Sequence, residues 1–134
     1  MDYLVTYYYG VGNMRHKVAG RKLSRKKAPR ELMLRNLVTS LVLYENIKTT
    51  EAKAKEARTL AEKLVTKAKK KDLAAIKYLN KYLLDVNAIK KINEVLVPRY
   101  EKRTSGYTRI LRLTRRAGDG AKMVQLEFIG ESNG

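Results

Sequence analysis

The chain lacks most of the residues from which enzymes build their sites. It contains no cysteine, which excludes disulfides and thiolate metal sites and permits a reducing compartment. Its one histidine, His16, lies between two cations, and the few acids are not clustered, so almost nothing is available for a general acid and base pair. No glycine-rich phosphate loop occurs. We therefore expect no enzyme, metal site, cofactor or small-molecule substrate.

Long apolar runs and negative charge are also scarce. No stretch reaches transmembrane length and the N-terminus lacks the positive start of a secretory signal, so we expect a cytosolic protein with no membrane partner. The 134 residues include 30 Lys and Arg against 13 acids, a formal net charge of +17. Such a surplus repels itself in a compact chain and predicts a polyanionic partner, nucleic acid first. The 44% hydrophobic content indicates a folded core rather than a disordered basic tail.

Composition divides the chain into four parts. Residues 1–13 hold four tyrosines and no Lys or Arg, and form an appendage that is a natural arm, an upstream start or an expression remnant. Its tyrosines stack on bases or have no partner. Residues 14–28 form a basic RNA-binding arm, expected to be mobile alone and ordered on RNA. Residues 29–130 are predicted to form one globular domain, and residues 131–134 a tail.

The first half of the globular domain is predicted to be a helix, a short strand and a second helix. Pro29 suits the first turn of the first helix. Residues 47–50 are mostly β-branched, which favours a short strand. Thr50 suits the N-cap of the second helix. The expected core positions of both helices follow helical spacing: Leu34, Leu37, Val38, Leu41, Val42, Ala57, Leu60, Ala61, Leu64, Val65 and Ala68.

Two shorter helices are expected next. Asp72 can cap the third helix, and Asp85 or Asn87 can start the fourth. Pro98 then stops the pattern, because proline cannot extend a helix interior. The expected core positions are Leu73, Ile76, Leu79, Leu83, Leu84, Ile89, Ile92 and Leu96.

Two features of these helices have alternative explanations. The second helix carries a Lys-rich face that could bind RNA, but we interpret it as solubilising charge. Tyr78 and Tyr82 lie one turn apart and could form a stacking platform. Aromatic residues at helical spacing more often pack in a core, so we favour packing for this pair.

From Tyr107 the apolar period changes to two, which predicts a strand. Turn residues follow at 115–120 and alternation resumes at 124–129, so a β-hairpin closes the chain. One face of the first strand carries Tyr107, Arg109, Leu111 and Leu113, and the other Thr108, Ile110, Arg112 and Thr114. The predicted fold is α+β: helix, short strand, three helices and C-terminal hairpin, in two layers with a small mixed sheet.

A second concentration of cations lies between Arg99 and Arg116, where seven Lys or Arg meet one acid, Glu101. Arginine dominates it, and a guanidinium both forks onto phosphate and stacks on bases. Tyr100 and Tyr107 bracket the cluster, which suits stacking on splayed bases. The alternative for Tyr107, packing in the hairpin core, is equally well supported by the pattern.

Several motifs over about residues 14–129 resemble, in order, those of the bacterial large-subunit ribosomal protein seventeen family. They are Met14-Arg15-His16-Lys17, Gly20-Arg21, Leu23, Arg35-Asn36, Ser40-Leu41, Ile47-Lys48-Thr49-Thr50, Lys53-Ala54-Lys55-Glu56, Gly106-Tyr107-Thr108-Arg109-Ile110-Leu111 and Arg116-Ala117-Gly118-Asp119. The chain departs from the family at Lys27-Ala28-Pro29, where polar residues and a histidine are common, and at Tyr44, often a histidine.

The resemblance implies an α+β structural constituent of the bacterial large ribosomal subunit, cytoplasmic and ribosome-bound. Members of that family bridge large-subunit ribosomal RNA segments near the outer opening of the nascent-chain tunnel, and touch large-subunit protein thirty-two. The basic clusters and the matched motifs together give the expected RNA-binding residues: Arg15, His16, Lys17, Gly20, Arg21, Lys22, Arg25, Lys26, Lys27, Arg30, Arg35, Asn36, Lys48, Thr49, Thr50, Arg103, Tyr107, Arg109, Arg112, Arg115 and Arg116.

Charge alone also permits two other classes of protein. A DNA-coating protein would prefer long duplex DNA over folded RNA. A cationic membrane-surface protein needs bulky apolar residues opposite its basic helix face, whereas the longest helix here offers mostly Ala and Leu. Sedimentation with large ribosomal subunits, rather than with chromatin or membranes, distinguishes the ribosomal hypothesis from both.

Overall fold

The order of helices and strands along the chain agrees with the order predicted from the apolar spacing. The computed structural model describes residue 23 and residues 25–130. Helix α2 (Lys27–Tyr44) leads through β1 (Asn46–Thr50) into α3 (Glu51–Ala68), and α4 (Leu73–Tyr82) follows. Then α5 (Val86–Lys91), the π-helical turn η1 (Ile92–Leu96) and α6 (Val97–Arg99) run on without a break. Strands β2 (Thr108–Arg112) and β3 (Met123–Phe128) end the fold.

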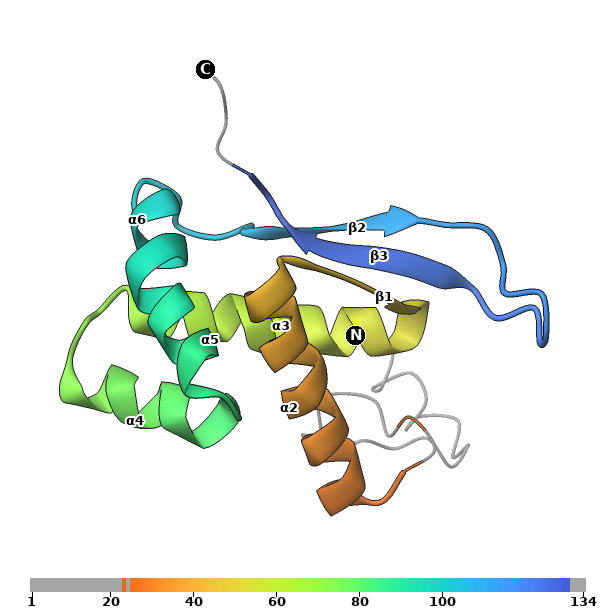
Figure 1. Ribbon diagram of the computed structural model, residues 1–134, viewed down its shortest axis with the longest axis horizontal. Coiled ribbons are helices and arrows are strands. Elements are labelled where there is room, and N and C mark those ends of the chain that lie inside the picture. Colours follow the sequence, from red (N-terminus) through yellow and green to blue (C-terminus); the bar gives the residue numbers. More distant parts are fainter. Residues whose placement is uncertain (1–22, 24, 131–134) are drawn as a thin grey trace, which may run out of the picture.

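The three strands form one sheet in the order β1-β3-β2. Leu126 of β3 lies opposite Ile47 on one side and Ile110 on the other, and both pairings are antiparallel. The predicted α+β class is confirmed, but the sheet is antiparallel throughout rather than mixed, because central β3 runs against both neighbours. Figure 1 shows the sheet as one layer above the helices, with α3 beneath it and the β2–β3 loop extending past the helical layer.

The core fills the space between the inner face of the sheet and the helices. On β3 the buried residues alternate with half-buried ones, as expected for a strand with one covered face. The fully buried side chains of the largest volume come from helices and sheet alike: Tyr100, Tyr107, Leu41, Leu64, Leu79, Ile92, Leu96, Leu126, Val38, Val42, Val65 and Val124. Most of the expected helix core positions are therefore confirmed.

Helix α4 differs from the expectation. Leu79 and Leu83 are buried, but Leu73 and Ile76 are 66% and 50% exposed and Leu84 is 45% exposed. Helix α4 has two apolar sides, and only one of them packs on α3 because α4 lies at the outside of the helical layer. The prediction that Leu73, Ile76 and Leu84 belong to the core is wrong.

Two helix ends also differ in detail. Pro98 does not stop the helix before itself, since the Tyr100 N–H bonds the Leu96 carbonyl at 3.0 Å and closes a turn around the proline. Thr50 occupies the N-cap of α3, as predicted, but its side chain makes no cap hydrogen bond. Instead the Glu51 N–H donates to the carbonyl of Lys122, the residue before β3, at 3.0 Å, so the sheet supplies an acceptor for the first turn of α3.

Glu45 joins three parts of the fold. It ends α2 in the left-handed region, with φ 64°, and its N–H donates to the Leu41 carbonyl at 2.7 Å. Its carbonyl accepts from the N–H of Phe128 at 2.9 Å, which attaches β3 to the end of α2. Its carboxylate accepts a hydrogen bond from Arg99 and lies 3.8 Å from the Lys91 ammonium. One acid thus fixes α2, the sheet and the last helices relative to one another.

Candidate nucleic-acid interface

The predicted basic arm lies mostly outside the described residues. Six of its predicted RNA-binding residues lie outside the described part of the chain: Arg15, His16, Lys17, Gly20, Arg21 and Lys22. Its described end comprises Arg25, Lys26 and Lys27, all exposed, followed by the half-buried Arg30. These cations stand where α2 begins, so the arm enters the folded body at the N-terminal end of that helix.

The two motif residues of α2 have different surroundings. Arg35 is half-buried, and its Nε lies 3.5 Å from the Tyr82 carbonyl oxygen, at the limit of a hydrogen bond. The Arg35 carbonyl accepts from the hydroxyl of Thr39 at 2.7 Å, and that hydroxyl accepts from the Leu84 N–H at 3.2 Å. Asn36 is exposed. Arg35 therefore connects α2 to α4, whereas Asn36 faces a ligand or solvent.

The outer face of the sheet carries two of the predicted cations. Lys48 on β1 and Arg109 on β2 are exposed and flank β3, opposite Gln125 and Glu127 respectively. The Arg109 Nε lies 3.2 Å from the Glu127 carboxylate, so that charge is partly neutralised. The neighbouring threonines are less accessible: Thr49 is buried, 8% exposed, and Thr50 is half-buried.

Tyr107 lies in the core. Its side chain is fully buried, its ring centroid is 5.2 Å from that of Tyr100, and its hydroxyl donates to the Thr104 carbonyl at 3.0 Å. Lys69 donates to the same hydroxyl at 3.3 Å. Because no face of the ring is open to a base, the packing alternative accounts for Tyr107 in this structure, and base stacking does not.

Glu62 on α3 holds the start of β2 and was missed by the sequence analysis. Its carboxylate accepts from the N–H groups of Tyr107 and Thr108, both at 3.1 Å, and from the Thr108 hydroxyl at 2.8 Å. The available signal was an acid beside the apolar stripe of an otherwise Lys-rich helix. The segment from Gly106 to Leu111 is therefore attached to α3 at its start. This attachment fixes the start of β2, on which the exposed Arg109 lies.

Tyr78 and Tyr82 pack together, as favoured above. Their ring centroids are 4.8 Å apart, and the ammonium groups of Lys67 and Lys81 lie 5.6 and 5.2 Å from the respective rings. The pair lines one wall of a groove of about 690 Å³ between α2, α3 and α4. Because each ring already contacts a cation and its neighbour, packing accounts for the pair without a base.

The β2–β3 loop, residues 113–122, presents the densest group of predicted arginines. Arg112, Arg115 and Arg116 are exposed, and so is Lys122, which the sequence analysis did not select. Arg116 and Asp119 form a two-bonded ion pair, Nε to Oδ1 at 2.9 Å and Nη2 to Oδ2 at 2.6 Å. The guanidinium holds the pKa of Asp119 far below its usual range.

A second group of cations forms where the end of α3 meets the loop after α6. The Lys69 ammonium donates to the Arg103 carbonyl, which brings two segments about thirty residues apart together. Lys70, Lys71, Lys102 and Arg103 are exposed there, and we call these four the α3-end cluster. Arg99, although in the same basic stretch, is turned inward to Glu45 and only 15% of its side chain is exposed.

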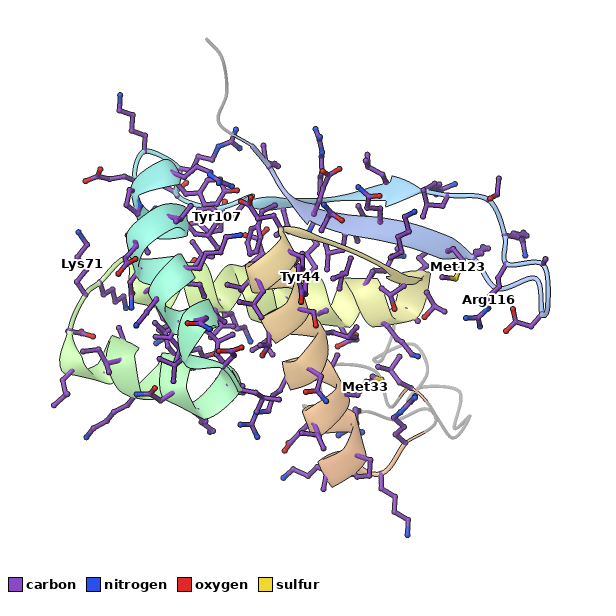
Figure 2. All side chains as sticks on the ribbon, in the orientation of Figure 1. Met33, Tyr44, Lys71, Tyr107, Arg116 and Met123 are labelled. Carbon is purple, nitrogen blue, oxygen red and sulfur yellow. The ribbon has the colours of Figure 1, made fainter. Side chains whose placement is uncertain are left out.

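Figure 2 places Lys71 and Arg116 at opposite ends of the longest axis of the molecule. The α3-end cluster and the β2–β3 loop are thus two basic ends separated by the folded body. Within the described residues, no group of three or more His, Asp or Glu could hold a metal ion. Nor is any helix in that part of the chain both long and apolar enough to cross a membrane.

Comparison with known proteins gives a consistent family. The sequence profile described as Ribosomal protein L17 matches residues 33–129. The chain is 45% identical over 118 residues to the "Large ribosomal subunit protein bL17" of Geobacter sulfurreducens, covering 88% of this chain and 67% of the relative. It is 48% identical over 109 residues to the protein of that name in Caldanaerobacter subterraneus, covering 81% and 97%. The corresponding figures for Pelobacter propionicus are 43% over 118 residues, covering 88% and 93%.

Proposed function

We propose a function from one premise: the chain belongs to the family of ribosomal protein L17. As a member it is a structural, non-enzymatic constituent of the large ribosomal subunit, bound to ribosomes in the cytoplasm. Its finer function, in our proposal, is to bind large-subunit ribosomal RNA and to bridge two of its segments.

The observation that carries this proposal is the separation of the two basic ends. The α3-end cluster and the β2–β3 loop stand at opposite ends of the long axis, so one stretch of RNA need not serve both (Figure 2). Each end carries its cations on a backbone that hydrogen bonds hold: the Lys69 ammonium donates to the Arg103 carbonyl at one, and the Arg116 N–H donates to the Ala121 carbonyl at the other. Cations on such a backbone neutralise phosphates at a smaller cost in backbone ordering.

The proposal also covers the basic arm and the neighbours of the protein on the ribosome. We propose that residues 14–28 form a basic arm that penetrates RNA, because eight cations and no acid lie between Arg15 and Arg30. The location near the outer opening of the nascent-chain tunnel rests on the family resemblance alone, as does contact with large-subunit protein thirty-two. Crosslinking from the arm within intact subunits tests both.

Salt dependence tests the binding step. If about 6–10 phosphates are neutralised, the logarithm of the affinity for protein-free large-subunit RNA falls with the logarithm of salt by about 0.7 per contact or more steeply. Filter binding between low and physiological salt measures this slope. A flat response contradicts the proposal.

Bridging is tested with two RNA duplexes that carry a donor and an acceptor fluorophore. At limiting protein the wild type should bring both into one complex. Replacing the four α3-end cations by alanine, or instead Arg112, Arg115 and Lys122, should lower energy transfer while RNA binding remains. A matched control replaces four exposed cations distributed along α3, Lys55, Arg58, Lys63 and Lys67. Equal loss in the control would show that total charge, rather than the two ends, brings RNA together.

A further inference from the structure

The β2–β3 loop has no core to give it shape. Every residue from 111 to 120 is exposed, and the loop extends beyond the helices (Figure 1). Exposed loops without buried contacts usually sample many conformations. Hydrogen bonds within this loop hold its conformation: the Arg116 N–H donates to the Ala121 carbonyl at 3.0 Å, and the Gly120 N–H donates to the Arg116 carbonyl at 2.8 Å.

Asp119 is at the centre of these bonds. Besides its two bonds from the Arg116 guanidinium, its Oδ1 accepts from the Ala121 N–H at 3.1 Å. The next residue, Gly120, has φ 67°, a conformation that side chains other than glycine rarely adopt. The carboxylate therefore fixes the turn on both sides of the position where the backbone reverses.

The turn in turn orients Arg115. The Arg115 Nη1 donates to the Gly120 carbonyl at 3.1 Å, so the direction of this guanidinium depends on the turn that Asp119 holds. Arg115, Arg112 and Lys122 line one hollow of about 190 Å³ at the base of the loop. The one acid lining it, Glu51, lies 3.0 Å from the Lys55 ammonium and so is already paired.

We propose that this hollow binds a phosphate of the RNA backbone through Arg112, Arg115 and Lys122, and that Asp119 is a positioning residue for it. The inference rests on the proposed function and adds a site and a role for an acid. Three cations converging on a small hollow offer several charge-assisted hydrogen bonds to one phosphodiester. Arg116, whose guanidinium is engaged by Asp119, acts through the turn rather than as a principal phosphate ligand.

The sign of the effect of Asp119 distinguishes positioning from simple electrostatics. Asp119→Asn raises the net charge by one, so unspecific attraction predicts tighter RNA binding. Positioning predicts weaker binding, by about 2- to 10-fold, the cost of immobilising one long side chain on association. Arg116→Lys keeps the charge but loses the two-bonded pair, and should weaken binding similarly. The probe is protein-free large-subunit ribosomal RNA at fixed salt, with the full-length chain.

Two further variants make the test specific. Glu101→Gln removes an exposed acid elsewhere and raises the charge equally, and it should bind as tightly as the wild type or more so. In an Arg115→Ala background, Asp119→Asn should have no further effect, because the residue that it positions is gone. Unchanged thermal unfolding of the variants shows that the fold is retained.

Each result supports or overturns one part of the proposal. Tighter binding of the Asp119→Asn protein, matching Glu101→Gln, overturns the positioning role, and full additivity with Arg115→Ala overturns its route through Arg115. An Arg115→Ala protein with wild-type affinity and salt slope overturns the phosphate site. If the wild type itself binds ribosomal RNA without salt dependence, the proposed function fails, and that result is separate from the others.

Discussion

At the scale of single residues, the scarce acids of this basic chain serve its structure. Glu62 accepts three hydrogen bonds from the start of β2, the Glu45 carboxylate joins the end of α2 to Arg99, and Asp119 closes the β2–β3 loop. Glu62 and Asp119 hold backbone donors or cations of the predicted interface, whereas Glu45 holds the folded body behind it. Net charge alone would have given these residues only the role of reducing the attraction to RNA.

Glu62→Ala should destabilise the fold. It leaves two backbone N–H groups and a hydroxyl at the start of β2 without their acceptor, and losing such bonds costs about 3 kcal/mol in total. Urea unfolding monitored by circular dichroism measures the change. Glu101→Ala, at an exposed position, is the control and should change the unfolding free energy by less than about 0.5 kcal/mol. An equal effect of both substitutions would contradict the role assigned to Glu62.

Tyr100 should make stability fall at alkaline pH. Burial raises the pKa of its phenol, whose hydroxyl donates to the Ile129 carbonyl, so the folded state favours the neutral form. The stabilisation is fully present below the unfolded pKa of about 10 and is lost as pH rises through the higher folded pKa. Thermal unfolding between pH 8 and 11 measures it. The Tyr100→Phe protein should lose less stability over that range, and identical pH profiles would refute the assignment.

The sequence predicted which side chains of a strand lie on opposite faces, because that depends on the local apolar alternation. It did not predict contacts between segments that are distant in the sequence. The alternation of β2 correctly separated Arg109 from Ile110. It could not show that α3 closes over Tyr107 through Glu62 and Lys69, about forty residues away. For the same reason the inward turn of Arg99 toward Glu45 left no local signal in the sequence.

At the scale of elements, the order of helices and strands followed from period and capping residues, whereas the position of β1 did not. Residues 47–50 were predicted as a strand, but nothing local indicates that they pair with β3 rather than with β2. Helix α4 shows the same limit, because a helix with two apolar sides does not reveal which side faces the core.

Helix α4 gives a direct comparison of its two sides. Leu79→Ala should cost about 2–5 kcal/mol of unfolding free energy, since Leu79 is 1% exposed and its removal leaves a cavity. Leu73→Ala, on the exposed side, should cost less than about 1 kcal/mol. Denaturant unfolding of both proteins measures the difference. Similar losses would mean that the outer side of α4 is covered in solution.

At the scale of the whole molecule, the folded body and the arm should separate. A protein that starts at residue 25 keeps α2 intact from Lys27, so its cooperative thermal unfolding should persist. Its affinity for large-subunit RNA should fall, because the removed segment includes four cations, Arg15, Lys17, Arg21 and Lys22. Calorimetry and filter binding measure the two properties. Loss of the unfolding transition would show that the arm is part of the core.

The strand order has a consequence for the time course of synthesis. Strand β1 has no partner until β3 exists, and the Thr50–Met123 pair spans about half of the chain. A growing polypeptide can form its helices before its sheet, because the sheet closes only after β3 has left the ribosome that makes it. The β2–β3 loop takes its final shape at the same late moment. Newly made copies therefore become competent to join a subunit only after β3 has been made and paired with β1.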